Sequence, residues 1–262
     1  MNCDDASTRL LTLCAPHLAR TQRPWVLALS GLPGSGKSTL AASTVAKARR
    51  EGWPALALSL DDFYLPRRAR QQLAAYIHPL LITRGVPGTH DLALLRHVLA
   101  QLPHASDRHP VPIPRFDKGR DTRQPPSRWR HVRGMPRLVI LEGWCLGITP
   151  QPDKALRRPV NPLEREEDVD GHWRHRVNHL LPDYLRLWNE ADARALIRVP
   201  DWQAVRRHRH QAEQALRQRH APQAMDDAAL DRFLQHYERL CRHALKHPPT
   251  HVDLHFTRTP FL

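Results

Sequence analysis

The segment Gly31-Leu-Pro-Gly-Ser-Gly-Lys-Ser38 constrains the fold of this chain more than any other feature. It matches G-x-x-x-x-G-K-[S/T], follows the apolar run Trp25–Ser30 and opens a helix-like pattern at Lys37–Arg50. The glycines allow successive backbone N–H groups to turn towards one anion, and the helix adds the positive end of its dipole. We therefore predict a phosphate-binding loop between a buried strand and a helix, with a nucleoside triphosphate as its ligand.

Each position of this loop has an expected role. The backbone of the glycine-rich stretch holds the phosphates, Lys37 reaches the β- and γ-phosphates, and the Ser38 hydroxyl holds Mg²⁺. Thr39 adds a contact to the α-phosphate. The expected cofactors are ATP and Mg²⁺, and the expected nucleotide contacts are Gly31, Gly34, Ser35, Gly36, Lys37, Ser38 and Thr39.

Apolar runs and helix-like patterns alternate along the rest of the chain. Continuous apolar strands between amphipathic helices predict an α/β protein with a parallel sheet covered on both faces. The expected strands are Trp25–Ser30, Ala55–Leu60, Leu138–Leu141, Ala195–Val199 and Val252–Phe256. The expected helices are Asp4–Arg20, Lys37–Arg50, Asp91–Gln101, Gly171–Trp188, Trp202–Arg219 and Asp226–Lys246.

Two stretches interrupt this alternation. Residues 103–136 are rich in Pro, Arg and Gly, and residues 150–170 are rich in Pro and acidic residues. Both predict long irregular connections, which in a compact enzyme are either functional or disordered. The second follows the third strand, at the sheet edge where ligands bind, so we expect it to overhang the site. We expect residues 1–262 to form a single domain with residues 1–20 as an N-terminal helix.

Carboxylates follow the second and third expected strands. Asp61 and Asp62 come directly after one, and Glu142 follows the other. An acid at the carboxyl end of a strand beside the phosphate loop points into the ligand crevice. Asp61 is our candidate general base, with Asp62 as a contact to the substrate or to a Mg²⁺-bound water, unless the pair caps the next helix. Glu142 is the candidate residue that orients Mg²⁺.

Charge and cysteine content argue against a nucleic-acid-binding protein and against a disulfide-linked or zinc-binding one. Lys and Arg exceed Asp and Glu by 14, but the basic residues are spread along the chain and no RNA-binding signature accompanies them. A basic surface also suits an enzyme whose ligands are anions, so we expect no nucleic-acid partner. The four cysteines lack disulfide or zinc spacing, which predicts free thiols in the cytoplasm. No secretory leader or membrane span is expected.

Several longer motifs resemble the D-glycerate 3-kinase family, from about residue 25 to the C-terminus. That family is related to uridine kinase, phosphoribulokinase and bacterial pantothenate kinase. The matching segments are Ser59-Leu-Asp-Asp-Phe-Tyr64, His78-Pro-Leu-Leu, Arg84-Gly-Val-Pro-Gly-Thr-His-Asp91, Ile113-Pro-Arg-Phe-Asp-Lys118, Leu141-Glu-Gly-Trp-Cys-Leu-Gly147 and Val205-Arg-Arg-His-Arg-His-Gln-Ala-Glu213.

The resemblance implies ATP-dependent phosphorylation of the 3-hydroxyl of D-glycerate, with Asp61 as base. It also implies a lid at residues 201–220 that closes over the phosphates through Arg209, with Arg206 as its neighbour. The expected fold is a P-loop NTPase three-layer sandwich with a five-stranded parallel sheet in the order 2-3-1-4-5. Two departures from the family pattern are His208 in place of a Trp and a shorter loop after Lys118, with Arg123 near the usual arginine.

Cations in the irregular segments support a small anionic acceptor, because a guanidinium pairs bidentately with a carboxylate. His90 and Asp91 are expected to contact acceptor hydroxyls or to cap the helix that starts there. The expected substrate-binding residues are Asp62, Tyr64, Arg84, His90, Asp91, Arg115, Lys118 and Arg123.

Three alternatives remain open from the sequence. The first is a kinase with another hydroxylated metabolite as its acceptor, such as a nucleoside or a pantothenate-like alcohol. A regulatory NTPase would need switch segments and a water-orienting residue, and neither is evident. Nucleic-acid binding would predict steeply salt-dependent affinity. The sequence is silent on oligomeric state.

Overall fold

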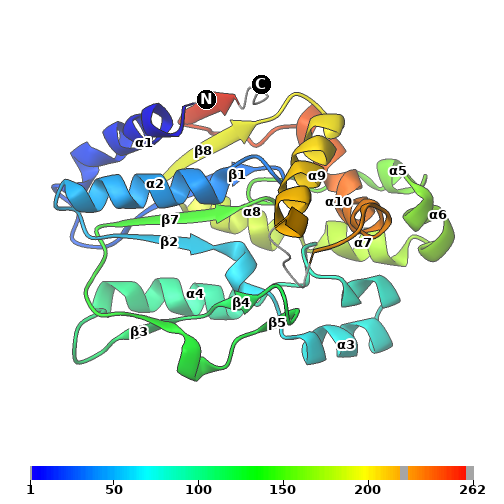
Figure 1. Ribbon diagram of the computed structural model, residues 1–262, viewed down its shortest axis with the longest axis horizontal. Coiled ribbons are helices and arrows are strands. Elements are labelled where there is room, and N and C mark those ends of the chain that lie inside the picture. Colours follow the sequence, from blue (N-terminus) through cyan, green and yellow to red (C-terminus); the bar gives the residue numbers. More distant parts are fainter. Residues whose placement is uncertain (1, 219–223, 258–262) are drawn as a thin grey trace.

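The computed structural model describes residues 2–218 and 224–257 and contains a five-stranded sheet in which every neighbouring pair is parallel. Its order, β2-β7-β1-β8-β9, is the predicted order 2-3-1-4-5, so the fold prediction is confirmed. Figure 1 shows the sheet between two layers of helices. The strands are β1 (Trp25–Gly31), β2 (Ala55–Ser59), β7 (Leu138–Gly143), β8 (Ala193–Arg198) and β9 (Leu254–Thr257).

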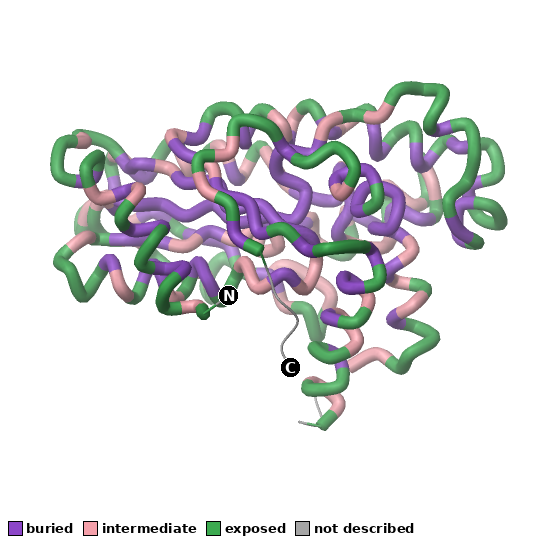
Figure 2. Tube along the Cα trace, turned by 90° about the horizontal axis from the view of Figure 1, so that it is seen from above, coloured by how far each residue is buried: buried purple, intermediate pink, exposed green. Residues whose placement is uncertain are grey.

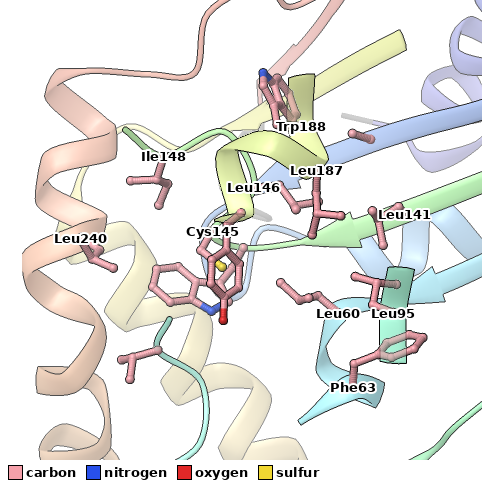
Figure 3. Close-up of a cluster of buried hydrophobic side chains, with 14 of the residues drawn as sticks. Leu60, Phe63, Leu95, Leu141, Cys145, Leu146, Ile148, Leu187, Trp188 and Leu240 are labelled. Carbon is pink, nitrogen blue, oxygen red and sulfur yellow. The ribbon is translucent and has the colours of Figure 1, made fainter. Parts of the chain in front are cut away.

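Alternate residues of each central strand enter different cores, as the period of two requires. In β7, Leu138 and Ile140 join the cluster beneath α1 and α2, whereas Val139 and Leu141 join the cluster beneath α4, α8 and α10. Figure 3 shows part of the second cluster, and Figure 2 shows the buried strands running through the centre of the molecule. The sheet is therefore buried on both faces, which explains why its strands are continuous apolar runs.

The predicted helices are present, but one of them is divided into two. The segment expected as one helix at Gly171–Trp188 is two, because Pro182 cannot supply an amide hydrogen and its ring opposes the preceding turn. The longer helices are α1 (Cys3–Leu18), α2 (Lys37–Arg50), α3 (Arg67–Tyr76), α4 (Leu92–Gln101), α7 (His172–His179), α8 (Leu181–Glu190), α9 (Trp202–Gln218) and α10 (Asp227–Lys246).

Helix α3 is absent from the prediction, and its packing explains why. The only residue that it buries is Arg70, so it has no apolar stripe for periodicity to detect. The Arg70 guanidinium donates to the carbonyls of Leu65, Ile82 and Asp121 and forms an ion pair with the Asp121 carboxylate at 2.9 Å. A buried cation with several acceptors thus anchors this helix where apolar side chains usually would.

Both stretches that were expected to be irregular contain some regular secondary structure. Residues 103–136 form two small antiparallel pairs, β3 (Val111–Ile113) with β6 (Arg130–Val132) and β4 (Phe116–Asp117) with β5 (Thr122–Arg123). Residues 150–170 contain α5 (Asp153–Leu156) and α6 (Pro162–Glu167).

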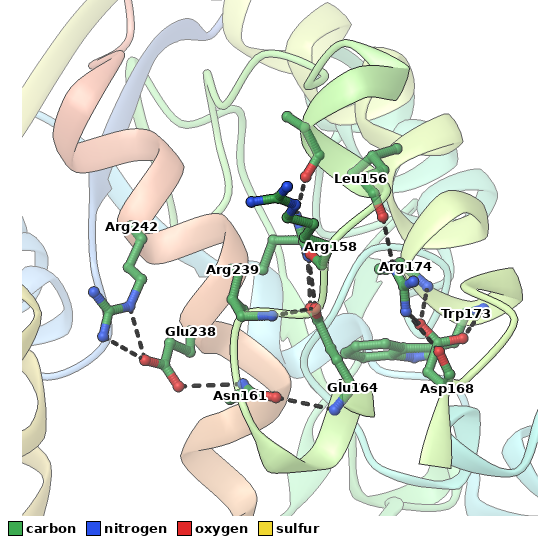
Figure 4. A network of polar contacts seen from close by, with 12 residues as sticks. Leu156, Arg158, Asn161, Glu164, Asp168, Trp173, Arg174, Glu238, Arg239 and Arg242 are labelled. Carbon is green, nitrogen blue, oxygen red and sulfur yellow. Dashed lines mark hydrogen bonds and ion pairs between the residues drawn. The ribbon is translucent and has the colours of Figure 1, made fainter. Parts of the chain in front are cut away.

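The predicted position of residues 150–170 is also corrected. They pack against α10 through the polar contacts of Figure 4, including a bidentate Arg239–Glu164 pair, and none of them lines the cavities at the phosphate loop described below. The expectation that this segment overhangs the site is therefore not met.

The N-terminal helix expected at Asp4–Arg20 is α1, which packs on α2. The last two positions of the predicted lid, Arg219 and His220, lie outside the described residues. Within the described ranges, no helix combines the length and apolar character needed to cross a bilayer.

Candidate active site

The phosphate loop joins β1 to α2 at the carboxyl edge of the sheet. Gly34 and Gly36 have φ angles of 78° and 92°, a region that glycine adopts without strain. A Cβ at Gly31 would lie 2.7 Å from Ser35 Oγ and 3.0 Å from a backbone oxygen of β8. The glycines are thus required for the turn itself, and the buried Ser35 hydroxyl has no hydrogen-bond partner among the described residues. This geometry fits the predicted binding of phosphate.

Ser38 and Glu142 come together at the start of α2. The Ser38 hydroxyl donates to Glu142 Oε1 at 2.8 Å, because β7 lies beside β1 and delivers Glu142 to the same edge. A hydroxyl and a carboxylate provide the oxygen donors that Mg²⁺ prefers, so these two residues fit a magnesium site. Burial lowers the pKa of the neighbouring Lys37, and the charges of Glu142 and Asp61 partly offset this effect.

Asp61 occupies a short 3₁₀ turn that follows β2 at Leu60–Phe63. Its carboxylate accepts from the Tyr64 hydroxyl at 2.8 Å and from Lys118 Nζ at 2.8 Å. Burial acts to raise the pKa of Asp61, but the Lys118 charge and these hydrogen bonds outweigh it and hold the pKa below its ordinary value. Asp61 is therefore ionised at neutral pH.

Asp62 follows Asp61 in the same turn and has a different hydrogen-bond partner. Its Oδ1 accepts from the Phe116 amide at 3.1 Å. Burial, together with the charge of Asp61, raises the pKa of Asp62, although the Phe116 amide opposes the shift. The alternative in which the pair caps the next helix is excluded, because the cap of α3 is Pro66, with no side-chain hydrogen bond.

Two cavities meet at this cluster. The larger, of about 640 Å³, lies between the phosphate loop, Asp61, Tyr64 and helices α9 and α10. The smaller, of about 570 Å³, lies over β2 and beside β4, with Asp62 and Arg115 in its wall. Three residues line both cavities, which marks the place where they join: Ser38, Lys118 and Glu142.

Helix α9 lies across the phosphate loop. A Cβ at Gly34 would lie 2.9 Å from His208 Cβ, so the loop and the helix are in close contact. Arg209 lines the larger cavity and pairs with Glu213 at 3.4 Å, and the buried Glu213 also accepts from the Met225 amide at 2.7 Å. The arginine of the predicted lid thus faces the phosphate side.

Arg206, its predicted neighbour, faces elsewhere. It pairs with Asp231 of α10 at 2.8 Å and lines an outer cavity, with no place in the wall of the larger one. Only Arg209 of the two therefore lies at the phosphate loop.

Comparison with known proteins agrees with this geometry. No protein-family model matches the chain. The uncharacterized kinase mug58 of Schizosaccharomyces pombe is 34% identical over 224 residues, which cover 82% of this chain and 79% of that protein. The chloroplastic D-glycerate 3-kinase of Arabidopsis thaliana is 30% identical over 222 residues, which cover 82% of this chain but only 46% of the plant protein. The chain belongs to the same kinase family as mug58, and it is a P-loop kinase related to D-glycerate 3-kinase.

A solved structure of D-glycerate 3-kinase from Cryptococcus neoformans shares this family's fold with the chain. It has a TM-score of 0.74 at 24% identity, and the match covers 90% of this chain and 87% of that one. A second solved structure, the YGR205w protein, has a TM-score of 0.71 at 26% identity, and the match covers 91% of this chain and 85% of that one.

The cations predicted to bind the acceptor in this kinase divide into two kinds. Arg84 pairs with Asp121, which Arg70 also holds, and Arg123 pairs with Asp91 at 3.0 Å. Arg115 lines the smaller cavity, Arg84 lines the larger one, and Lys118, which is paired with Asp61, lines both.

His90, Asp91 and Arg123, three of the predicted substrate contacts of this kinase, line neither cavity. Asp91 caps α4 through the Leu94 amide at 3.0 Å, which is the alternative that the sequence left open. His90 is buried against the ring of Tyr64, its Nδ1 lies 2.9 Å from the Tyr184 hydroxyl, and burial lowers its pKa to about 3. These three residues therefore support the residues around the site and do not face either cavity.

Two aromatic residues to which the sequence assigned no role hold the Arg84–Gly85 segment of this kinase. The Tyr237 hydroxyl donates to the Arg84 carbonyl at 3.0 Å, and Trp144 Nε1 donates to the Gly85 carbonyl at 2.8 Å. A Cβ at Gly85 would lie 1.7 Å from the Tyr237 hydroxyl oxygen, so this position requires glycine. Tyr237 gave no signal in the sequence, because it matches the apolar stripe of α10.

Proposed function

We propose that this P-loop kinase transfers the γ-phosphoryl group of ATP, with Mg²⁺, to the 3-hydroxyl of D-glycerate and forms 3-phosphoglycerate. The observation that carries the proposal is the position of Asp61, an ionised carboxylate that lines the larger cavity and is hydrogen-bonded to Lys118, which lines both cavities. The larger cavity contains the phosphate loop, and the smaller one is lined by cations suited to an acidic acceptor. The plant relative named D-glycerate 3-kinase supports the choice of acceptor.

The residues of the larger cavity suit in-line phosphoryl transfer, in which positioning and charge stabilisation supply most of the rate. Lys37 and Arg209 face the space above the phosphate loop and would stabilise charge on the transferring group. Ser38 and Glu142 would hold Mg²⁺, which supplies further neutralisation of the phosphate oxygens when bound.

Asp61 would accept the proton of the attacking hydroxyl. Lys118 and Tyr64 keep this carboxylate ionised at neutral pH, which is the form that accepts a proton. Tyr64 also fixes the direction of the carboxylate, because the buried His90 ring packs against the Tyr64 ring with 4.6 Å between centroids. The base is therefore oriented before the acceptor binds.

The test is an ADP-release assay with ATP and Mg²⁺ and five separate acceptors: D-glycerate, L-glycerate, glycerol, uridine and pantothenate. We expect turnover with D-glycerate well above the others. A Lys37→Ala variant is the matched control, because it removes the phosphate contact from a side chain outside the apolar cores. It should abolish turnover and keep the circular dichroism spectrum. Turnover with uridine or pantothenate and none with D-glycerate would refute the proposed acceptor and leave the P-loop kinase assignment intact.

A further inference from the structure

The cations beside the site differ in whether the protein itself already neutralises them. Arg84 shares Asp121 with Arg70, and Arg123 is paired with Asp91. Both arginines are also largely covered, with side-chain exposures of 20% and 15%. A guanidinium held by an internal carboxylate is a poor receptor for a second one, because binding would have to break an existing charge-assisted contact.

Arg115 has no such partner, and Lys118, although paired with Asp61, is far more exposed than either arginine, with a side-chain exposure of 58%. No acid in the described part of the chain lies within ion-pair distance of Arg115, although its charge acts on Asp62. Lys118 donates to Asp61 Oδ2, but an ammonium group has three donors, so two remain for a ligand. Both residues line the smaller cavity, on the segment around β4.

Asp62 supplies a third point of contact in this cavity. Its Oδ1 is occupied by the Phe116 amide, and no described donor is bonded to its Oδ2. Asp61 lines the larger cavity and Asp62 the smaller one, and Lys118, which contacts Asp61, lines both. A small molecule bound where the cavities join can therefore place one hydroxyl at Asp62 and the hydroxyl of the neighbouring carbon at Asp61.

We propose that Arg115 and Lys118 bind the carboxylate of the acceptor, Asp62 accepts a hydrogen bond from its 2-hydroxyl, and Asp61 accepts from its 3-hydroxyl. This inference rests on the proposed function and specifies its acceptor site. Arg84 and Arg123 are then structural braces of the surrounding loops. Three different contacts around one stereocentre distinguish the D from the L form. The positive charges of Arg115 and Lys118 offset the repulsion between Asp62 and the carboxylate of the bound acceptor.

The transfer step balances within this arrangement. The 3-oxygen forms a bond to the γ-phosphorus while the bond from that phosphorus to the bridging oxygen breaks, and its electron pair leaves with ADP. The proton of the 3-hydroxyl goes to Asp61. Lys118 Nζ lies 2.8 Å from Asp61 Oδ2. By contacting both the acceptor's carboxylate and Asp61, it sets the distance between that carboxylate and the reacting 3-hydroxyl.

The experiment measures kcat/KM for D-glycerate, L-glycerate and glycerol in the wild type and in Arg115→Gln, Asp62→Asn and Arg120→Gln. Arg120 lies on the same segment, with 75% side-chain exposure, and lines neither cavity, so it controls for loss of one positive charge. In Arg115→Gln we expect kcat/KM for D-glycerate to fall about 10- to 100-fold, the effect of one lost bond to a charged group, with glycerol unchanged. Asp62→Asn should reduce the preference for D- over L-glycerate, and Arg120→Gln should change neither ratio.

An unchanged ratio of glycerate to glycerol in Arg115→Gln, together with collapse of that ratio in Arg84→Gln, would overturn the inference and leave the proposed function standing. Absence of turnover with D-glycerate in the wild type would overturn both. Equal losses in Arg115→Gln and Arg120→Gln would also overturn it, because they would show an effect of general surface charge.

Discussion

Ser38 donates a hydrogen bond from its hydroxyl to Glu142 Oε1 at 2.8 Å, although 104 positions separate the two residues in the sequence. The sheet order creates this contact. Strand β7 pairs with β1 in a register that sets Glu142 opposite Leu29, just before the loop that leads to Ser38. The pairing of β7 with β1 therefore determines which carboxylate meets the phosphate loop, and this carboxylate is the one that we assign to Mg²⁺.

The Ser38–Glu142 pair predicts a change in metal dependence. Glu142→Gln keeps the size of the side chain and removes its charge, so the Mg²⁺ concentration that gives half-maximal ADP formation should rise about tenfold or more, as for other changes around bound metals. Titration of Mg²⁺ at fixed ATP measures this effect. Glu190→Gln, on the exposed end of α8, is the matched control. Equal metal requirements in the two variants would exclude Glu142 from the metal site.

The two adjacent aspartates should differ in their effect on turnover. Asp61→Asn should lower kcat by roughly two to four powers of ten, the range of general base catalysis, because an amide cannot accept the proton. ATP affinity should change little. Asp62→Asn should cost less, since its carboxylate is bonded to the Phe116 amide. Single-turnover rates and calorimetric ATP affinities measure both effects, and a larger loss in Asp62→Asn would reverse our assignment of the base.

The sheet could be predicted from the sequence because its central strands are buried on both faces and appear as separate apolar runs. Helix α3 could not, because it is anchored by the buried Arg70 and has no apolar stripe. The site residues that come from strand ends, Asp61 and Glu142, have local signals, since a carboxylate directly after an apolar run is visible in the sequence.

The partners of the site residues could not be predicted in the same way. The sequence shows four arginines and lysines in loops but does not show that Asp121 and Asp91 neutralise two of them. Tyr237 lies more than 150 positions from the Arg84 carbonyl that it holds, so only the folded chain shows their contact.

Arg209 should act on catalysis more than on nucleotide binding. It lines the larger cavity above the phosphate loop, and a cation in that place stabilises the charge that develops during transfer. Arg209→Ala should therefore lower kcat strongly and change the calorimetric Kd for ATP only slightly. Arg206→Ala is the control on the same helix, because Arg206 pairs with Asp231 outside this cavity. Loss of ATP binding with kcat preserved would exclude Arg209 from the transition state.

Burial of His90 predicts a dependence of stability on pH. Its pKa is lowered to about 3 in the folded chain, below the ordinary value of 6.5, so the unfolded chain binds a proton more readily. The stability due to neutral His90 is therefore complete above the unfolded pKa and is lost as the pH falls from about 6.5 towards 3. One such group changes the free energy of unfolding by about 1.4 kcal/mol per pH unit.

His90→Phe keeps an aromatic ring at this position and removes the group that titrates. Urea unfolding at several pH values between 6 and 4 should show a slope smaller by about 1.4 kcal/mol per pH unit than in the wild type. Identical slopes in the two proteins would show that His90 becomes protonated in the folded chain.

The buried Arg239–Glu164 pair of Figure 4 predicts a large loss of stability when it is broken. Arg239 donates to both Glu164 oxygens, at 2.7 and 2.6 Å, and to the carbonyls of Ala155 and Arg158. Arg239→Met leaves the Glu164 charge buried without its partner and should lower the free energy of unfolding by about 3–5 kcal/mol. Arg232→Met, at the exposed pair with Glu167, should cost about 1 kcal/mol or less.

The double variant Glu164→Leu/Arg239→Met separates charge burial from the other contacts. Removing both charges should recover part of the loss, because no isolated ion remains in the interior. Recovery should be incomplete, because these two side chains also make other hydrogen bonds. Glu164 accepts from the Val160 amide at 3.0 Å, and Arg239 donates to the carbonyls of Ala155 and Arg158. Helix α10 carries both Arg239 and Tyr237, so a loosened helix should also weaken the support of Arg84. Urea unfolding measures the stability of the three variants, and a double variant less stable than Arg239→Met would show that the charge pair is not what holds α6 against α10.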